Sequence, residues 1–164
     1  MNNLFWLIPG KLAGRPGPDR VGWDLPSMRR AGVGAVLSVN DGLLCHREDF
    51  AACGMAYACV PLSDNAPPRA GDEEICLRAL PVAYDFVERQ LAEGRVTVVH
   101  CSSGKDRTGL FLGYYLIRSA GLSPTAAIEE VQRVRPIALS AQGWQEFALD
   151  VLRGIPRPEG AEFD

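Results

Sequence analysis

The sequence predicts an α/β fold in which helices flank a central, mostly parallel β-sheet and a functional loop joins one strand to a buried helix. Three apolar or β-branched runs, residues 33–39, 55–60 and 96–100, lie between turn residues, as is typical of strands covered on both faces. Helical segments separate these runs, and this alternation implies right-handed crossovers between parallel strands. The 164 residues, 47% of them hydrophobic, suffice for one domain with a single core.

The first 42 residues predict short elements. Residues 4–8 and 11–13 are expected to form two short strands, and residues 14–19 a loop without regular structure. Residues 24–32 have an acidic start and a glycine stop, which indicate a short helix. The strand that follows ends at Asn40-Asp41-Gly42, a strong turn signal.

The middle of the chain predicts one short and one long helix on either side of the second strand. The short helix begins near residue 45 and ends at Gly54, and the long helix begins after Gly71 with acidic residues in its first turn. Apolar residues follow at helical spacing to Leu91. Pro81 should kink or restart this helix because proline has no N–H to donate to Leu77.

Three helices are predicted after the third strand. Residues 108–117 are apolar nearly all round, which indicates a helix buried in the core. Ser123-Pro124 begins a helix that continues to residue 134, and the last helix covers about residues 140–152. Arg133 and Arg135 are expected on a solvated face. We expect one domain over residues 1–164, with a flexible tail at about 155–164.

The stretch from Val96 to Gly109 has the pattern of an anion-binding loop. A β-branched strand leads into a loop with five residues between Cys101 and Arg107, and the buried helix follows at once. The unpaired N–H groups of such a loop and of the first helical turn attract a phosphate. Gly104 allows the loop to curl, and Arg107 can donate two hydrogen bonds to phosphate oxygens.

Cys101 is the expected nucleophile of this loop. A helix N-terminus and nearby positive charge favour the thiolate form of a cysteine. Attack on a bound phosphate monoester would give a cysteinyl-phosphate intermediate. Thr108 would donate a hydrogen bond to the sulfur when it departs, whereas His100 is expected to fix the loop geometry by hydrogen bonding.

The stretch His100-Cys101-Ser-Ser-Gly-Lys-Asp-Arg107-Thr108-Gly109 resembles the signature loop of the cysteine-dependent protein tyrosine and dual-specificity phosphatases, His-Cys-x-x-Gly-x-x-Arg-Ser/Thr-Gly, at every fixed position. The resemblance implies their α/β fold and a phosphatase activity. It also implies that the phosphate is bound by the residues of the loop, Ser102, Ser103, Gly104, Lys105, Asp106 and Arg107. A weaker resemblance to bacterial members covers the segment from Trp6 to Pro16.

A carboxylic acid is expected to protonate the leaving group and then to activate the hydrolytic water. Asp64 fits this role, because it follows the second strand and the carboxyl ends of parallel strands meet at one edge of the sheet. Its Pro-x-x-Asp context also resembles the general-acid loop of the dual-specificity family. Asp41 is the second candidate, but a turn residue is the better interpretation of it. Gln142 or Gln145 resembles a glutamine that places the hydrolytic water in some family members, and spacing does not choose between them.

The substrate follows mainly from Lys105 and Asp106. Gly-Lys-x-Arg loops resemble phosphatases that act on phosphoinositides or inositol phosphates, but Asp106 can neutralise the lysine. We therefore rank a phosphoprotein first, with phosphotyrosine and also phosphoserine or phosphothreonine as targets, and a phosphoinositide or inositol phosphate second. A net charge of −3 argues against nucleic acid as a partner, and no stretch has the length of a membrane span. The sequence does not indicate the oligomeric state.

No cofactor or metal is expected, because Arg107, the loop amides and the helix end supply the positive charge. The five cysteines, an odd number without a Cys-x-x-Cys pair, favour free thiols and a cytoplasmic location. Two other classes remain open: a catalytically inactive phosphate-binding module, and a hydrolase with a Cys101–His46 dyad.

Overall fold

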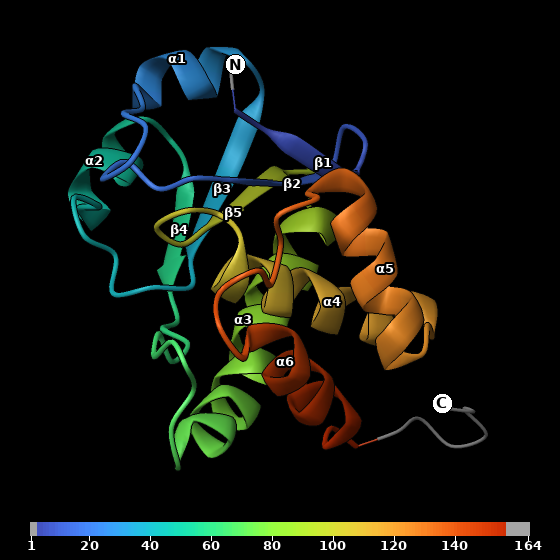
Figure 1. Ribbon diagram of the computed structural model, residues 1–164. Helices are drawn as coiled ribbons and strands as arrows, with labels where there is room; N and C mark the ends of the chain where they lie inside the picture. Colours follow the sequence, from blue (N-terminus) through green and yellow to red (C-terminus); the bar gives the residue numbers. More distant parts are fainter. Residues whose placement is uncertain (1–2, 157–164) are drawn as a thin grey trace.

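The computed structural model describes residues 3–156 and contains one five-stranded sheet with helices on both faces (Figure 1). The spatial order of the strands is β1-β2-β5-β3-β4. Their bounds are β1 Phe5–Ile8, β2 Leu12–Arg15, β3 Val33–Ser38, β4 Ala56–Cys59 and β5 Val96–His100. Only β1 and β2 are antiparallel, and the other three pairings are parallel. The predicted mostly parallel sheet is confirmed.

The helices form two layers (Figure 1). Helices α1 (Leu25–Arg30) and α2 (Arg47–Ala52) lie on one side of the sheet. On the other side lie α3 (Asp72–Ala92), α4 (Asp106–Ala120), α5 (Pro124–Val134) and α6 (Trp144–Arg153). None of the helices within residues 3–156 is long and apolar enough to cross a membrane.

Neighbouring residues of the central strands face opposite layers. Val98 belongs to the small apolar cluster beneath α1 and α2, whereas Val99 belongs to the large core formed with α3 to α6. Val36 and Leu37 of β3 divide in the same way. This alternation is the two-residue period of a strand, and it explains why strands covered on both faces are continuously apolar.

Two helices differ from their predicted form. Helix α3 continues through Pro81 as one element, because the buried residues Leu80 and Ala83 on either side of the proline pack on the same core. Helix α6 begins at Trp144 rather than near residue 140, since Gly143 has a left-handed conformation with φ +79° that ends the preceding turn. Residues 157–164 of the expected tail lie outside the described residues.

Candidate active site

The signature loop joins the end of β5 to the first turn of α4. Cys101 is 2% exposed, and its Sγ accepts a hydrogen bond from Thr108 Oγ1 at 3.1 Å. Gly104 has φ +67°, and a Cβ there would lie 2.7 Å from the carbonyl carbon and oxygen of Arg15. Only glycine therefore fits the curl of this loop.

The main-chain N–H groups of residues 102–107 are free for a ligand: within residues 3–156, none of them donates to another main-chain or side-chain acceptor. The N–H groups of Asp106 and Arg107 belong to the first turn of α4, where no intrahelical acceptor exists. Free donors of this kind, together with the positive end of a helix, make an anion-binding concavity.

His100 is fully buried under the loop and bonded on both ring nitrogens. Nδ1 donates to the main-chain oxygen of Cys101 at 2.8 Å, because a carbonyl can only accept. Nε2 then accepts from the hydroxyl of Ser38 at 2.6 Å, and the Ser38 oxygen accepts from the Tyr57 hydroxyl at 2.7 Å. Burial lowers the pKa of His100 to about 4, so the ring is neutral at pH 7. These bonds hold the carbonyl of the candidate nucleophile in place.

The lowered pKa of His100 predicts a loss of stability in acid. The unfolded ring takes up a proton near pH 6.5 and the folded ring only near pH 4. The contribution of the neutral His100 ring to the free energy of unfolding is therefore complete above pH 6.5. It falls by about 3 kcal/mol as the pH decreases to 4. We expect urea unfolding of His100→Asn to lack this part of the pH dependence. The control His46→Asn removes the other histidine, which is exposed, and should keep this part of the pH dependence. Equal curves of unfolding free energy against pH for His100→Asn and wild type would contradict the assignment.

An open pocket of about 390 Å³ lies at the carboxyl ends of the parallel strands. Its lining includes Asn40, Asp41 and Asp64, which follow the first two parallel strands as expected. It also includes Ser102 and Arg107 of the signature loop, whereas Cys101 is not among the lining residues. Asp64 is exposed and belongs to the loop after β4. Asp41 Oδ1 accepts from the N–H of Leu43 at 3.2 Å, which agrees with its interpretation as a turn residue.

Asn65, the residue after Asp64, holds the loop that contains Asp64 in place. The side-chain amide of Asn65 donates to both oxygens of Asp72, at 3.0 Å each, and the indole N–H of Trp144 donates to the main-chain oxygen of Asn65 at 2.9 Å. The Arg69 N–H donates to Asp72 at 2.7 Å and is the largest cause of the lowered pKa of that carboxyl group. Asp72 therefore stays ionised and keeps the loop beside the pocket.

Comparison with known families identifies the loop and its fold together. Residues 1–147 match the family model described as PTP-SAK: Swiss Army Knife protein, DSP-PTPase phosphatase domain. The chain belongs to this family. Its matched region is a phosphatase domain of the dual-specificity type by sequence.

Two proteins of Arabidopsis thaliana are similar to this chain. Phosphatidylglycerophosphate phosphatase PTPMT2 is 28% identical over 119 residues, which cover 71% of the chain and 49% of the plant protein. Phosphatidylglycerophosphate phosphatase PTPMT1 is 31% identical over 127 residues, which cover 74% of the chain and 35% of the plant protein. The chain thus spans about half or less of the length of these relatives.

A solved structure shows the same fold as this chain. The crystal structure of Tk-PTP in the active form aligns with a TM-score of 0.75 and 22% sequence identity. The alignment covers 94% of this chain and 99% of Tk-PTP.

The side chain of Lys105 in the signature loop forms an ion pair with the next residue, Asp106. Its Nζ bonds to Asp106 Oδ2 at 2.7 Å, and Asp106 Oδ1 accepts from the N–H of Ala141 at 3.2 Å. Neither residue lines the pocket beside Arg107. This geometry agrees with the possibility that Asp106 neutralises Lys105.

Sequence reasoning missed the residues that hold the loop from outside. Arg135, expected on a solvated face, donates instead to the main-chain oxygens of Ser103 (2.7 Å) and Gly104 (3.2 Å). Both carbonyls are thereby fixed by Arg135, which follows the end of α5 and precedes a proline. Arg133 does lie on the exposed face, paired with Glu130.

The N-terminal loop, predicted only as irregular, holds the other side of the signature loop. The Gly17 N–H donates to the main-chain oxygen of Ser102 at 2.8 Å. The Ser102 hydroxyl donates to Asp19 at 2.6 Å and accepts from Arg20 Nε at 3.1 Å. The sequence signal for this contact is the Gly14-Arg-Pro16 segment, which directly precedes Gly17 and resembles bacterial family members.

The glutamines and the other cysteines lie apart from the pocket lining. Gln145 accepts a hydrogen bond from Gln132 at 3.0 Å, and neither Gln142 nor Gln145 lines the pocket. Cys45 lies 3.7 Å from His100 Nε2 and 3.8 Å from the Ser38 hydroxyl. All five cysteines are free thiols.

Proposed function

We propose that this chain hydrolyses phosphate monoesters of phosphoproteins through a cysteinyl-phosphate intermediate. The observation that supports this most directly is the set of unpaired N–H groups at residues 102–107 around Cys101. Unpaired main-chain donors of this kind suit the three non-bridging oxygens of a phosphate group. Arg107 adds a planar guanidinium that can bond to two of these oxygens.

The proposed first step is attack of Cys101 Sγ on phosphorus. The S–P bond forms as the bond from phosphorus to the leaving oxygen breaks, and Asp64 gives its proton to that oxygen. In the second step Asp64, now ionised, takes a proton from water, whose oxygen attacks phosphorus while the S–P bond breaks. The Thr108 hydroxyl, already 3.1 Å from Sγ, would stabilise the thiolate that leaves.

The charges around the pocket favour a substrate with one phosphate group. Among the described lining residues, Arg107 is the only basic one, whereas Asp19, Asp41 and Asp64 are acidic. Lys105, the remaining cation of the loop, is bonded to Asp106. Additional phosphates of an inositol polyphosphate would meet carboxylates at the mouth of the pocket. A singly phosphorylated side chain of a protein avoids this repulsion.

A lipid phosphate monoester is the second candidate. It is favoured by the plant relatives, whose names give phosphatidylglycerophosphate as their substrate. The two candidate substrates differ in the group attached to the ester oxygen, which is a protein side chain in the first and a lipid in the second.

Phosphate release from four substrates tests this proposal: a phosphotyrosine peptide, a phosphothreonine peptide, phosphatidylglycerophosphate in detergent micelles and a soluble phosphoinositide. We expect the highest kcat/KM on a phosphopeptide. A higher value on phosphatidylglycerophosphate would replace the first candidate by the second. A higher value on the phosphoinositide would contradict the charge argument.

The proposed role of Asp64 predicts a dependence on the leaving group. Asp64→Asn should lower kcat on a phosphopeptide by ~100-fold or more, the scale of general-acid loss. The loss should be smaller on para-nitrophenyl phosphate, whose leaving group needs less help from a proton. The matched control is Asp41→Asn. Asp41 lines the same pocket, and the asparagine side-chain oxygen can still accept from the Leu43 N–H in place of the carboxylate oxygen. Wild-type turnover of the phosphopeptide by Asp64→Asn would assign the acid elsewhere.

A further inference from the structure

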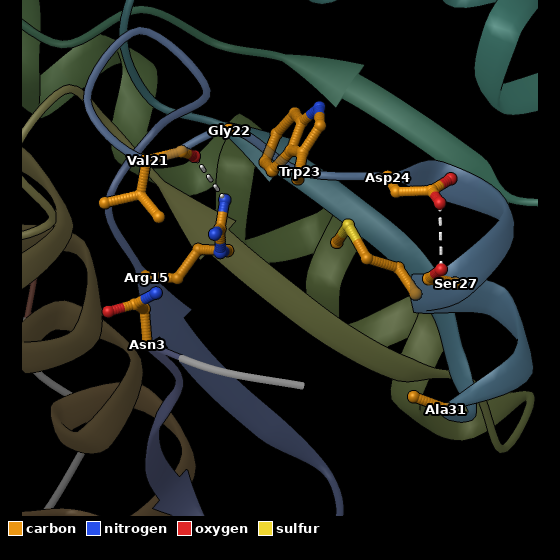
Figure 2. A pocket seen from close by; sticks show the side chains of 9 residues that line it. Asn3, Arg15, Val21, Gly22, Trp23, Asp24, Ser27 and Ala31 are labelled. Carbon is orange, nitrogen blue, oxygen red and sulfur yellow. Dashed lines mark hydrogen bonds between the residues drawn. The ribbon is translucent and has the colours of Figure 1, made fainter.

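A second cavity of about 400 Å³ lies beneath the N-terminal loop, and it shares no lining residue with the catalytic pocket. Its wall includes Arg15 at the end of β2 and residues of the segment that leads into α1 (Figure 2). Arg15 pairs in register with His100 in the sheet, and Trp23 packs edge-on against the His100 ring at 4.9 Å between centroids. The cavity is therefore adjacent to the signature loop but outside it.

Arg15 is a buried cation whose bonding capacity is largely unused. Its side chain is 2% exposed, and Nη1 donates to the main-chain oxygen of Val21 at 3.3 Å (Figure 2). The guanidinium carbon lies 5.2 Å from the centre of the Trp23 ring. Nε is the one buried side-chain nitrogen or oxygen within residues 3–156 that has no hydrogen-bond partner.

No carboxylate forms an ion pair with Arg15 in the described part of the chain. The ion pairs found there involve Arg95, Lys105 and Arg133, but not Arg15. Burial alone lowers the pKa of Arg15, without an opposing effect from a carboxylate. Buried charges in proteins are normally paired and hydrogen-bonded, since removing a lone ion from water is very unfavourable. Arg15 therefore lacks the ionic partner that a buried charge normally has among the described residues.

The rest of the wall restricts the kind of anion. Asp24 belongs to the lining, and its carboxylate accepts from the Ser27 hydroxyl at 2.9 Å. This negative charge disfavours a dianion such as a phosphate monoester, whereas Arg15 still attracts a single negative charge. Val21, Trp23 and Met28 give the wall apolar surface. We propose that the cavity binds a small carboxylate, with its oxygens on the Arg15 guanidinium and its apolar part against Trp23 and Met28.

Titration with benzoate, followed by ¹H–¹⁵N NMR of the indole N–H of Trp23, tests the proposal. The Trp23 signal is assigned by its absence from Trp23→Phe, because the chain has three tryptophans. We expect a saturable shift with a dissociation constant on the order of 1 mM, as is usual for a small ligand with few contacts. Inorganic phosphate should bind at least ~10-fold more weakly. Equal or tighter binding of phosphate would overturn the assignment to a carboxylate.

Three variants decide whether Arg15 is the binding residue. Arg15→Met should weaken benzoate binding by ~10-fold or more. Arg29→Met, at an exposed cation in the last turn of α1, should bind as wild type does. Arg107→Met should also bind benzoate normally, and loss of the Trp23 shift in that variant would place the anion in the catalytic pocket. A shift that does not saturate, or that Arg15→Met leaves unchanged, would overturn the proposal.

A further variant covers the case in which Arg15→Met does not fold. Ala31→Phe changes an exposed residue of the cavity wall and leaves Arg15 in place. The larger side chain should occupy the cavity and weaken benzoate binding by ~10-fold or more, with the amide spectrum otherwise preserved. Undiminished binding by folded Ala31→Phe would overturn the proposal as well.

Discussion

Replacing Cys101 with serine should lower phosphate release by a factor on the order of 10⁴ or more, the scale seen when an enzyme loses its nucleophile. A serine hydroxyl keeps a hydrogen-bonding position near Thr108 but is not ionised at neutral pH. The fold should survive, because the change is nearly isosteric at a site that is 2% exposed. Initial rates on a phosphopeptide and on para-nitrophenyl phosphate measure the loss.

The matched control is Cys53→Ser, a partly buried cysteine at the end of α2 that does not line the pocket. It should keep wild-type turnover. Rapid acid quenching of wild type with a ³²P-labelled substrate should trap label on the protein, and Cys101→Ser should trap none. Turnover by Cys101→Ser within ~10-fold of wild type would exclude the proposed mechanism.

Replacing Arg107 with lysine should lower kcat/KM by about 10³-fold, although the positive charge is retained. A lysine ammonium cannot bond in one plane to two phosphate oxygens, and its charge is more localised. Most of this loss should appear in kcat if the guanidinium binds the transition state more strongly than the substrate.

Arg20→Lys is a stringent control for this result. Arg20 also contacts the signature loop, through the Ser102 hydroxyl, but it is exposed and does not line the pocket. We expect a change of less than ~5-fold, because exposed polar contacts contribute little. Equal losses for Arg20→Lys and Arg107→Lys would show that loop position, and not phosphate contact, limits the rate.

The features that the sequence predicted well are local. Each buried strand is a continuous apolar run, and the signature loop places its candidate groups within eight consecutive residues. The position of Asp64 at this edge of the sheet followed from one topological rule about parallel strands.

The features that were missed depend on contacts between distant segments. Arg135 is 32 residues from the carbonyl of Ser103 to which it donates, and Asp19 is 83 residues from Ser102. The local sequence pattern does not distinguish Arg135, which bonds to the loop, from Arg133, which lies two positions earlier and is exposed to solvent. The continuity of α3 through Pro81 was likewise decided by core packing on both sides of the proline, which outweighs a local preference.

The long-range contacts of the signature loop also order events during protein synthesis. Residues 100–107 leave the ribosome before Arg135 and Ala141, whose bonds to Gly104 and Asp106 span 31 and 35 residues. A nascent chain that ends before residue 141 therefore lacks part of the framework that holds the loop. The phosphate cradle is completed only after α5 has been translated, so a chain stalled earlier presents Cys101 without its fully assembled surroundings.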